Sequence, residues 1–410
     1  MSLNLTPSGE RLHIGIFGNR NAGKSSLINA ITGQQLAIVS EHKGTTTDPV
    51  LKSMEILPLG PVTIIDTPGM DDEGDLGQQR ILKAQLILNK TDIALLVVDA
   101  VQGITSKDKE LWAQLQAKKI PSLLVFNKCD QLTEMEQALL AASAFSFAQK
   151  NCRFVSALKG TNIQALKDSL AALRPQEEEK ELVGDLLQPL DLVILVTPID
   201  SAAPKGRLIL PQQLVLRNIL DNHALALVVQ ESELEQALKK LPTRPRLVIT
   251  DSQAFAKVAK IVPQDVELTS FSILMARYKG TLRDAIKAAR VLDRLQNGDK
   301  VLISEGCTHH RQCGDIGTEK LPAWIKRFTG INPEFHWTSG LEFPQDLSDY
   351  KLVIHCGGCM LNEKEMQHRN EIAVQQQIPM TNYGIIIAYI NGILQRTLAP
   401  LPGYSRLLQE

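Results

Sequence analysis

A glycine-rich turn between an apolar run and a helical pattern constrains the front of the chain most strongly. Residues 12–18 form a short apolar stretch, and residues 18–25 read Gly-Asn-Arg-Asn-Ala-Gly-Lys-Ser. In such a loop, consecutive backbone N–H groups and a helix N-terminus can surround phosphate oxygens, because glycine permits a close approach. The pattern therefore predicts a strand, a phosphate-binding loop, and a helix from Lys24 to about Thr32.

The alternation of apolar strands and amphipathic helices continues to about residue 173. Further runs of strand length are 62–66, 93–99 and 122–126, and helical patterns such as 76–90 and 107–118 lie between them. This alternation is typical of βαβ units, in which helices cover both faces of a parallel sheet. The front of the chain is therefore predicted to be an α/β domain.

Three further motifs follow in the order that a guanine-nucleotide site requires. Asp66 begins Asp-Thr-Pro-Gly, Asn127 begins Asn-Lys-Cys-Asp, and Ser156 is followed by Ala157. A carboxylate such as Asp130 can accept hydrogen bonds from both the ring N–H and the exocyclic amine of guanine, which adenine does not offer together. We therefore predict a GTP-binding domain that binds GTP or GDP with Mg²⁺. The predicted nucleotide-binding residues are Gly18, Asn19, Asn21, Ala22, Gly23, Lys24, Ser25, Ser26, Asp66, Gly69, Asn127, Lys128, Asp130, Ser156 and Ala157.

At these residues the chain resembles the potassium-activated branch of small GTPases, which includes tRNA-modification and ribosome-assembly GTPases. Asn21 matches the asparagine that helps to hold K⁺ in that branch, and Thr46 matches its Mg²⁺-linked threonine beside Ser25. Thr47 departs from the pattern, because the branch usually has arginine there. A monovalent cation could neutralise the charge that develops between the phosphates. The resemblance implies slow GTP hydrolysis, faster in K⁺ than in Na⁺. The catalytic residues that it implies are Lys24, Asn21, Thr46, Asp66 and Gly69.

Two further segments follow a charged linker at residues 174–181. A second alternating block runs from about 190 to 268, and a third begins with a helical passage near 271–296. The sequence therefore predicts an α/β chain of three domains. Their predicted bounds are 1–174, 182–268 and 269–410.

Composition is that of an ordinary globular protein and predicts a cytoplasmic location. The formal net charge is -1 and aromatic residues make up 4% of the chain, so no overall field recruits nucleic acid or an anionic membrane. The longest apolar run, residues 385–390, is far shorter than the ~20 residues that span a bilayer, and the start lacks the pattern of a secretory signal. We therefore expect neither nucleic acid nor membrane as a partner.

Cysteine and histidine cluster near the end of the chain. Cys307 is followed by His309, and His355 precedes Cys356 in a Cys-Gly-Gly-Cys motif that ends at Cys359. Clustered cysteines with interleaved histidines in a cytosolic chain are more often a metal site than a disulfide. Three readings fit the spacing: a Cys₃His zinc site, an iron–sulfur cluster on three thiolates, or buried thiols without metal.

The order of a GTPase domain, a middle α/β block and these cysteine motifs resembles the [FeFe]-hydrogenase maturation GTPases, the F-type maturases. The resemblance covers essentially the whole chain. It implies a [4Fe–4S] cluster on Cys307, Cys356 and Cys359, with His309 or His355 as a weak fourth ligand. By the same resemblance, the second domain makes a homodimer and the third binds the cluster. The family acts as a scaffold and carrier: it delivers a two-iron precursor to apo-[FeFe]-hydrogenase, and two radical-SAM maturases are its upstream partners.

Two other functions compete with this interpretation. An RNA-modification or ribosome-assembly GTPase with a structural zinc would be expected to have a basic surface with stacking aromatic residues. A redox enzyme whose cluster turns over substrate would be expected to have a second cofactor motif, and the sequence shows none. The scaffold GTPase is therefore the preferred prediction.

Overall fold

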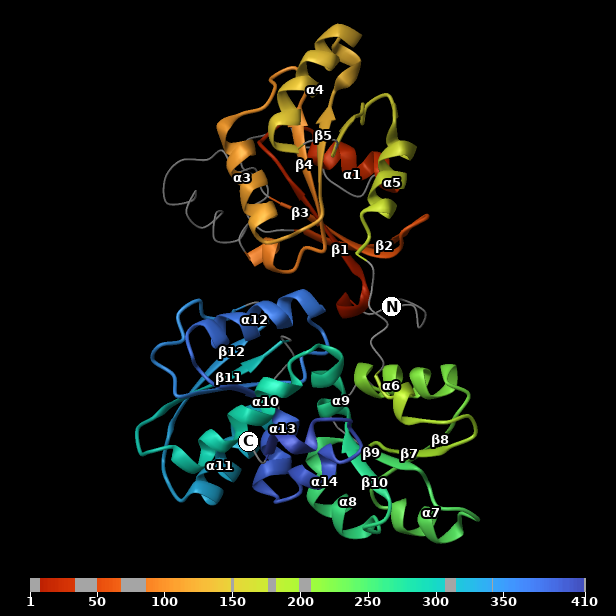
Figure 1. The fold of residues 1–410 in the computed structure, drawn as a ribbon, viewed down its shortest axis with the longest axis vertical. Coiled ribbons are helices and arrows are strands. Elements are labelled where there is room, and N and C mark those ends of the chain that lie inside the picture. Colours follow the sequence, from red (N-terminus) through yellow and green to blue (C-terminus); the bar gives the residue numbers. More distant parts are fainter. Residues whose placement is uncertain are drawn as a thin grey trace. The chain divides into compact units, whose positions relative to one another are not determined.

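The computed structural model describes residues 8–33, 50–67, 86–148, 151–175, 182–198, 208–306, 315–340 and 342–408. The chain divides into two compact units, residues 1–177 and residues 178–410. Both units consist of sheets covered by helices, so the predicted α/β class is confirmed (Figure 1).

A six-stranded sheet organises the first unit, in the order β2-β3-β1-β4-β5-β6. All neighbouring strands are parallel except β2, which pairs antiparallel with β3 at the edge. The strands are β1 Leu12–Phe17, β2 Val50–Ile56, β3 Gly60–Asp66, β4 Ile93–Asp99, β5 Ser122–Asn127 and β6 Cys152–Phe154. The helices are α1 Lys24–Thr32, α3 Ser106–Ala117, α4 Glu134–Ala148 and α5 Ile163–Ala172.

Helices cover both faces of this sheet, each over its own core. Side chains of α1 and α5 pack on one face, and those of α3 and α4 pack on the other. Strand β4 is buried along its whole length, as expected for a central strand between two helical layers. The carboxyl ends of β1, β3 and β5 therefore meet at one edge, where the predicted nucleotide motifs begin.

Two four-stranded parallel sheets make up the second unit, in the orders β10-β9-β7-β8 and β12-β11-β13-β14. The strands are β7 Leu192–Val196, β8 Leu225–Val229, β9 Leu247–Thr250, β10 Glu267–Ser270, β11 Lys300–Glu305, β12 Glu334–Ser339, β13 Leu352–His355 and β14 Met380–Asn382. The helices are α6 Leu210–Asp221, α7 Leu234–Lys240, α8 Phe255–Ile261, α9 Phe271–Tyr278, α10 Leu282–Ala289, α11 Leu321–Thr329, α12 Glu363–Gln375, α13 Tyr383–Ile390 and α14 Leu394–Leu398.

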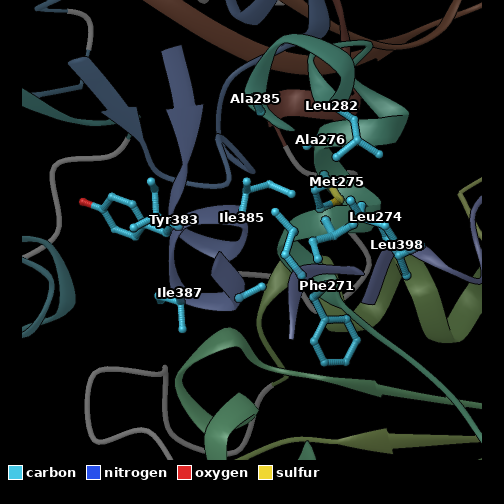
Figure 2. Close-up of a cluster of buried hydrophobic side chains, with 14 of the residues drawn as sticks. Phe271, Leu274, Met275, Ala276, Leu282, Ala285, Tyr383, Ile385, Ile387 and Leu398 are labelled. Carbon is cyan, nitrogen blue, oxygen red and sulfur yellow. The ribbon is translucent and has the colours of Figure 1, made fainter. Parts of the chain in front are cut away.

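One apolar core joins the two sheets of the second unit. Alternate residues of β7 and β9 and alternate residues of β11 and β13 contribute to it, because successive strand residues point to opposite faces. Helices α9, α10, α13 and α14 supply much of the rest, and Figure 2 shows their side chains together. Because both sheets share this core, they form one compact unit, residues 178–410. The predicted domain boundary between residues 268 and 269 is therefore not tested by this division and stays a prediction.

The remaining described helical segments are short. The 3₁₀ turns are Ser8–Glu10, Cys129–Gln131, Gly184–Leu186, Ser252–Ala254, Arg290–Arg294 and Ser405–Leu408, and a π-helical turn spans Ile316–Lys320. Across the described ranges, no helix is both long enough and apolar enough to cross a membrane.

Candidate functional site

The predicted phosphate loop joins β1 to α1. Gly18 has a φ of 141°, and a Cβ there would lie 2.1 Å from the Val97 carbonyl oxygen of β4. Gly23 caps the N-terminus of α1 with a φ of 85°, and a Cβ there would lie 2.2 Å from Nδ2 of Asn127. Both positions therefore require glycine, and together they place the backbone N–H groups of the first turn of α1 at the mouth of the loop.

The side chain of Lys24 lies along this loop. Its Nζ donates hydrogen bonds to the carbonyl oxygens of Gly18 and Asn19, each at 2.9 Å, and the residue is buried. A phosphate in the loop would compete with these two carbonyls for the ammonium group. This geometry is compatible with the predicted role of Lys24.

Ser25 and Asp66 meet at the predicted Mg²⁺ position. The Ser25 hydroxyl donates to Oδ2 of Asp66 at 3.3 Å, because strand β3 lies beside β1 and brings its last residue next to the loop. Burial raises the pKa of Asp66, and Lys24 and the Ser25 hydrogen bond oppose that shift. A divalent cation would supply the charge that favours the ionised carboxylate. Thr46 and Gly69, the other predicted residues here, lie outside the described residues.

Asn127 connects the phosphate loop to the predicted guanine loop. Its Nδ2 donates to the Ala22 carbonyl at 3.0 Å, and its Oδ1 accepts from the Ala157 backbone N–H at 3.0 Å. The predicted guanine motif thus includes one residue whose amide holds two loops together. A hydrogen bond from Ser156 and the nearby Lys159 keep the pKa of Asp130 below its usual range, so this carboxylate is ready to accept from guanine.

Of the other predicted residues around the loop, some are exposed and some make hydrogen bonds to neighbouring side chains. Asn21 is exposed with a φ of 60°, and Ser26 follows in the first turn of α1. Lys128 pairs with Asp99 at 2.6 Å, with Nζ donating to Oδ2. Asn19 donates through Nδ2 to Thr105 Oγ1 at 3.1 Å. Thr105 begins the capping box of α3 and was not predicted as part of the site; its Thr-x-x-Asp pattern was the signal available.

Cys356 occupies the carboxyl end of β13, beside the end of β11. Its Sγ accepts hydrogen bonds from the backbone N–H of Gly306 at 3.1 Å and of Gly358 at 3.4 Å. Gly358 has a φ of 60°, and a Cβ there would lie 2.6 Å from the sulfur of Met366. Burial raises the pKa of Cys356 to about 11, and the two N–H groups act in the opposite direction.

Cys359 ends the same short turn, and it too is partly buried. Burial raises its pKa, while the charge of Lys279 acts to lower it. Cys307 and His309 lie outside the described residues. Within the ranges that the structure describes, no three His, Cys, Asp or Glu side chains are grouped closely enough to hold a metal ion.

His355 makes two hydrogen bonds inside the protein. Its Nδ1 lies 2.8 Å from the Cys356 carbonyl oxygen, which can only accept, and its Nε2 lies 3.0 Å from Nη1 of Arg369, which can only donate. The ring is therefore neutral with its proton on Nδ1. Burial, followed by the charge of Arg369, lowers its pKa to about 3. The Nε2 lone pair is engaged, so this geometry argues against His355 as an iron ligand.

Buried charged residues surround the thiols and were not predicted from the sequence. Glu305 accepts from the Tyr383 hydroxyl at 3.1 Å, and Figure 2 shows this hydroxyl pointing away from the apolar cluster. Lys279 and Arg369 are also almost fully buried. Charged residues are rarely buried without a partner or a function, but nothing in their sequence context distinguishes them from surface residues.

The described part of the thiol site fits an iron–sulfur cluster. Two sulfurs lie on one short turn, backbone N–H groups point at one of them, and cations lie close by. Hydrogen bonds to sulfur and burial are the means by which proteins tune such clusters.

Comparison with known proteins divides the chain into three parts. A family model described as "50S ribosome-binding GTPase" matches residues 13–128. "Hydrogen maturase F dimerization domain" matches residues 182–280, and "Hydrogen maturase F tetramerization domain" matches residues 283–400. The two hydrogen maturase F models together match more than half of the 410 residues.

Individual relatives cover a smaller share. GTPase Der of Kosmotoga olearia is 32% identical over 207 residues, which is 48% of this chain and 46% of that protein. The tRNA modification GTPase MnmE of Nitrosomonas eutropha is 38% identical over 132 residues, which is 31% of this chain and 29% of that protein. The chain thus spans less than half the length of both relatives. Among solved structures, Era of Aquifex aeolicus bound to GDP and AlF₄⁻ matches with a TM-score of 0.38 and 21% identity, covering 53% of this chain and 92% of that one.

Proposed function

Because the chain belongs to the hydrogen maturase F family and carries a GTPase domain, we propose that it is a GTP-binding scaffold for [FeFe]-hydrogenase maturation. In this role it carries a [4Fe–4S] cluster and delivers a two-iron precursor to apo-hydrogenase. Two radical-SAM maturases would act upstream of it. The proposed location is the cytoplasm.

The observation that carries this proposal is the environment of Cys356. Its sulfur lies at the carboxyl edge of a parallel sheet, where open α/β sheets place their ligands, and it accepts two backbone N–H bonds. Cys307, Cys356 and Cys359 would hold the cluster. When bound, the cluster supplies an iron with an exchangeable coordination position. The chain's own part is to orient the sulfurs, exclude water and balance their charge.

The fourth cluster position is proposed to involve His309 in preference to His355. Both ring nitrogens of His355 already have protein partners, and Arg369 would lose its hydrogen bond to Nε2 if iron took that lone pair. The hydrogen bond from Nδ1 to the Cys356 carbonyl gives His355 a different role. It fixes the backbone at the residue that carries the sulfur.

The GTPase unit is proposed to bind Mg²⁺·GTP and to hydrolyse it slowly. Ser25 and Asp66 would hold Mg²⁺ together with Thr46, Lys24 would contact the phosphates, and Asp130 would accept from guanine. Asn21 would help to hold K⁺ at the phosphates. The contact between Ser25 and Asp66 supports this arrangement, because it brings the two predicted Mg²⁺ ligands within 3.3 Å of each other.

Hydrolysis rates in matched salts test the role of Asn21. We expect faster GTP hydrolysis in KCl than in NaCl at equal ionic strength, and we expect Asn21→Ala to remove the difference. Asn89→Ala is the matched control, because Asn89 lies away from the phosphate loop and its Oδ1 accepts from Lys118. Equal wild-type rates in the two salts would remove the proposed K⁺ site.

Reconstitution of the full chain under anaerobic conditions tests the cluster ligands. We expect wild-type protein to become brown, with broad absorbance near about 400 nm, and Cys356→Ser to lose most of its iron. Cys152→Ser is the control, because Cys152 is a cysteine of the GTPase unit that the proposal does not use. Equal iron binding by wild type and Cys356→Ser would exclude the proposed ligand set.

The homodimer is proposed to form through strand β8. This strand is the edge of its sheet, and Leu225 and Val228 are 50% and 40% exposed. An unprotected apolar edge offers unpaired backbone groups to a second copy of the same strand. The dimerization model that matches residues 182–280 supports this assignment.

The alternative function, an RNA-modification or ribosome-assembly GTPase, draws support from the front of the chain. The names of the MnmE relative and of the first family model refer to tRNA and to the 50S ribosome. The ribosome-binding model ends at residue 128, and residues 182–280 and 283–400 match the two hydrogen maturase F models instead. The net charge of -1 also offers no overall attraction to RNA.

A further inference from the structure

Lys279 is a buried cation at the end of the helix that leads to the thiol site. It is 2% exposed, and it follows α9 as the C-cap residue, with its backbone N–H donating to the Met275 carbonyl. Helix α9 is fixed in place by the shared core, in which Leu274, Met275 and Ala276 are buried (Figure 2). The backbone from which the Lys279 side chain extends is therefore held in place by a packed helix.

The side chain of Lys279 reaches the turn that carries Cys359. Its Nζ donates a hydrogen bond to the carbonyl oxygen of Leu361, two residues beyond Cys359. The same turn is closed by the Leu361 backbone N–H, which donates to the Gly358 carbonyl at 3.1 Å. Lys279 thus connects α9 directly to the turn that carries both sulfurs.

Lys279 also shares a cavity with Cys356 and His355. The cavity has a volume of about 10 Å³, which is close to the minimum for one water molecule. Little solvent therefore fits among the residues that line this cavity, so the charge of the buried Lys279 acts through a medium of low dielectric constant. The charge of Lys279 acts to lower the pKa of Cys359 and that of His355, although burial is the larger influence on each.

Arg369 and Glu305 are two further buried charged residues near Cys356. Arg369 donates to Glu365 at 2.8 Å, so its charge is balanced by a carboxylate. Glu305 adds a negative charge on the Cys356 side, which disfavours a thiolate there. Lys279 differs from Arg369 in its place, because its Nζ donates to a backbone carbonyl of the turn that carries the sulfurs.

We propose that the charge of Lys279 raises the reduction potential of the cluster that Cys356 and Cys359 would help to hold. This inference rests on the proposed function. A cluster on three thiolates gains one further negative charge when it takes up an electron. A buried ammonium group that donates to the sulfur-bearing turn stabilises the reduced form more than the oxidised form, because the reduced form carries more negative charge. Lys279 therefore raises the potential and keeps the cluster reducible.

An EPR-monitored redox titration of the reconstituted full chain tests this role. Lys279→Gln keeps a hydrogen-bond donor for the Leu361 carbonyl and removes the charge. We expect at least a tenfold lower ratio of reduced to oxidised cluster at a fixed potential, which is about 59 mV for a one-electron couple. Lys351→Gln is the matched control, because Lys351 is exposed at the amino end of β13 and should titrate like wild type.

The conservative variant Lys279→Arg separates charge from packing. We expect its potential to stay close to that of wild type. Lys279→Gln could bind too little iron to titrate while Lys279→Arg binds as much iron as wild type. That result would support the proposal, because it would show that the cluster needs the positive charge in order to form. Equal loss of iron in both variants would overturn the proposal, because both keep a donor and only one keeps the charge.

The two proposals fail in different ways. A wild-type chain that forms no cluster refutes the proposed function itself. A wild-type chain that forms the cluster, with Lys279→Gln on the same titration curve, refutes only the assignment of Lys279.

Discussion

Arg369 shows how single residues support the thiol site. Its guanidinium has no exposed surface, and it donates to the Glu365 carboxylate at 2.8 Å, to the Gly340 carbonyl at 2.8 Å and to His355 Nε2. Its central carbon also lies 5.1 Å from the centroid of the Phe343 ring. One side chain thus holds a helix, a loop and the histidine that precedes Cys356.

Replacing Arg369 by Met is expected to lower the free energy of unfolding of the second unit by about 3–5 kcal/mol, because Glu365 is left as an unpaired buried charge. Urea denaturation measures the change. Lys239→Met is the control, since Lys239 and Glu235 form an exposed helical ion pair with the same i,i+4 spacing. A similar loss for both variants would show that burial of the Arg369 pair is not what makes it important.

Asp66→Asn is expected to stabilise the nucleotide-free first unit by up to about 1 kcal/mol and to weaken Mg²⁺-dependent nucleotide binding. The reason is that burial raises the pKa of Asp66, so its ionised form is costly until a cation arrives. Protonation removes that cost, and the stability difference between variant and wild type should therefore shrink as the pH falls through the raised pKa. Denaturation curves at several pH values, with and without Mg²⁺, measure both effects. A variant that is less stable than wild type at neutral pH would contradict the argument.

Among the secondary-structure elements, strand β8 leads to a direct test of the proposed dimer. The Leu225 backbone N–H donates toward β7, so by alternation the N–H of Val228 faces the open edge. Val228→Lys is expected to disrupt the proposed dimer contact and lower the mass in solution without unfolding the protein, because lysine on an edge opposes strand pairing. Light scattering coupled to gel filtration measures the mass. Leu139→Lys, on the exposed surface of α4, should keep the mass of the wild type. An unchanged mass in Val228→Lys would place the interface elsewhere.

Most central strands could be predicted from the sequence, and several edge strands could not. The predicted runs at 62–66, 93–99 and 122–126 match β3, β4 and β5, because buried parallel strands are continuous apolar runs. Strand β12 was missed because its residues, Glu-Phe-His-Trp-Thr-Ser, are only partly buried at an edge. Strand β14 has three residues, too few for any periodic pattern.

The helical passage predicted near 271–296 is divided in the structure into α9 and α10, and the division places Lys279 at the end of α9. Helix α9 ends at Tyr278, and Gly280 follows with a φ of 75°, a conformation that ends a helix. This break is where Lys279 turns into the thiol site. The nucleotide residues could be proposed from the sequence because their motifs fix both spacing and chemistry, and the structure places the described ones at or beyond the ends of β1, β3, β5 and β6. The roles of Lys279, Glu305 and Arg369 depend on tertiary packing and could not.

For the whole molecule, the division into two compact units predicts separable stability. We expect two unfolding transitions on heating, with Mg²⁺·GTP raising only the one that belongs to the first unit. At a nucleotide concentration of about 100 times Kd, the stabilisation is about 2.7 kcal/mol. Differential scanning calorimetry of the full chain measures both transitions. A single transition that shifts as a whole with GTP would show that the units unfold together.

The identity of the bound metal tests the central claim most directly. Elemental analysis and sulfide assay of full-length protein, purified and reconstituted without oxygen, should give about four iron and four sulfide per chain. Zinc in tetrahedral coordination with no inorganic sulfide would contradict the account, because the thiols would then serve a structural site and not an assembly platform.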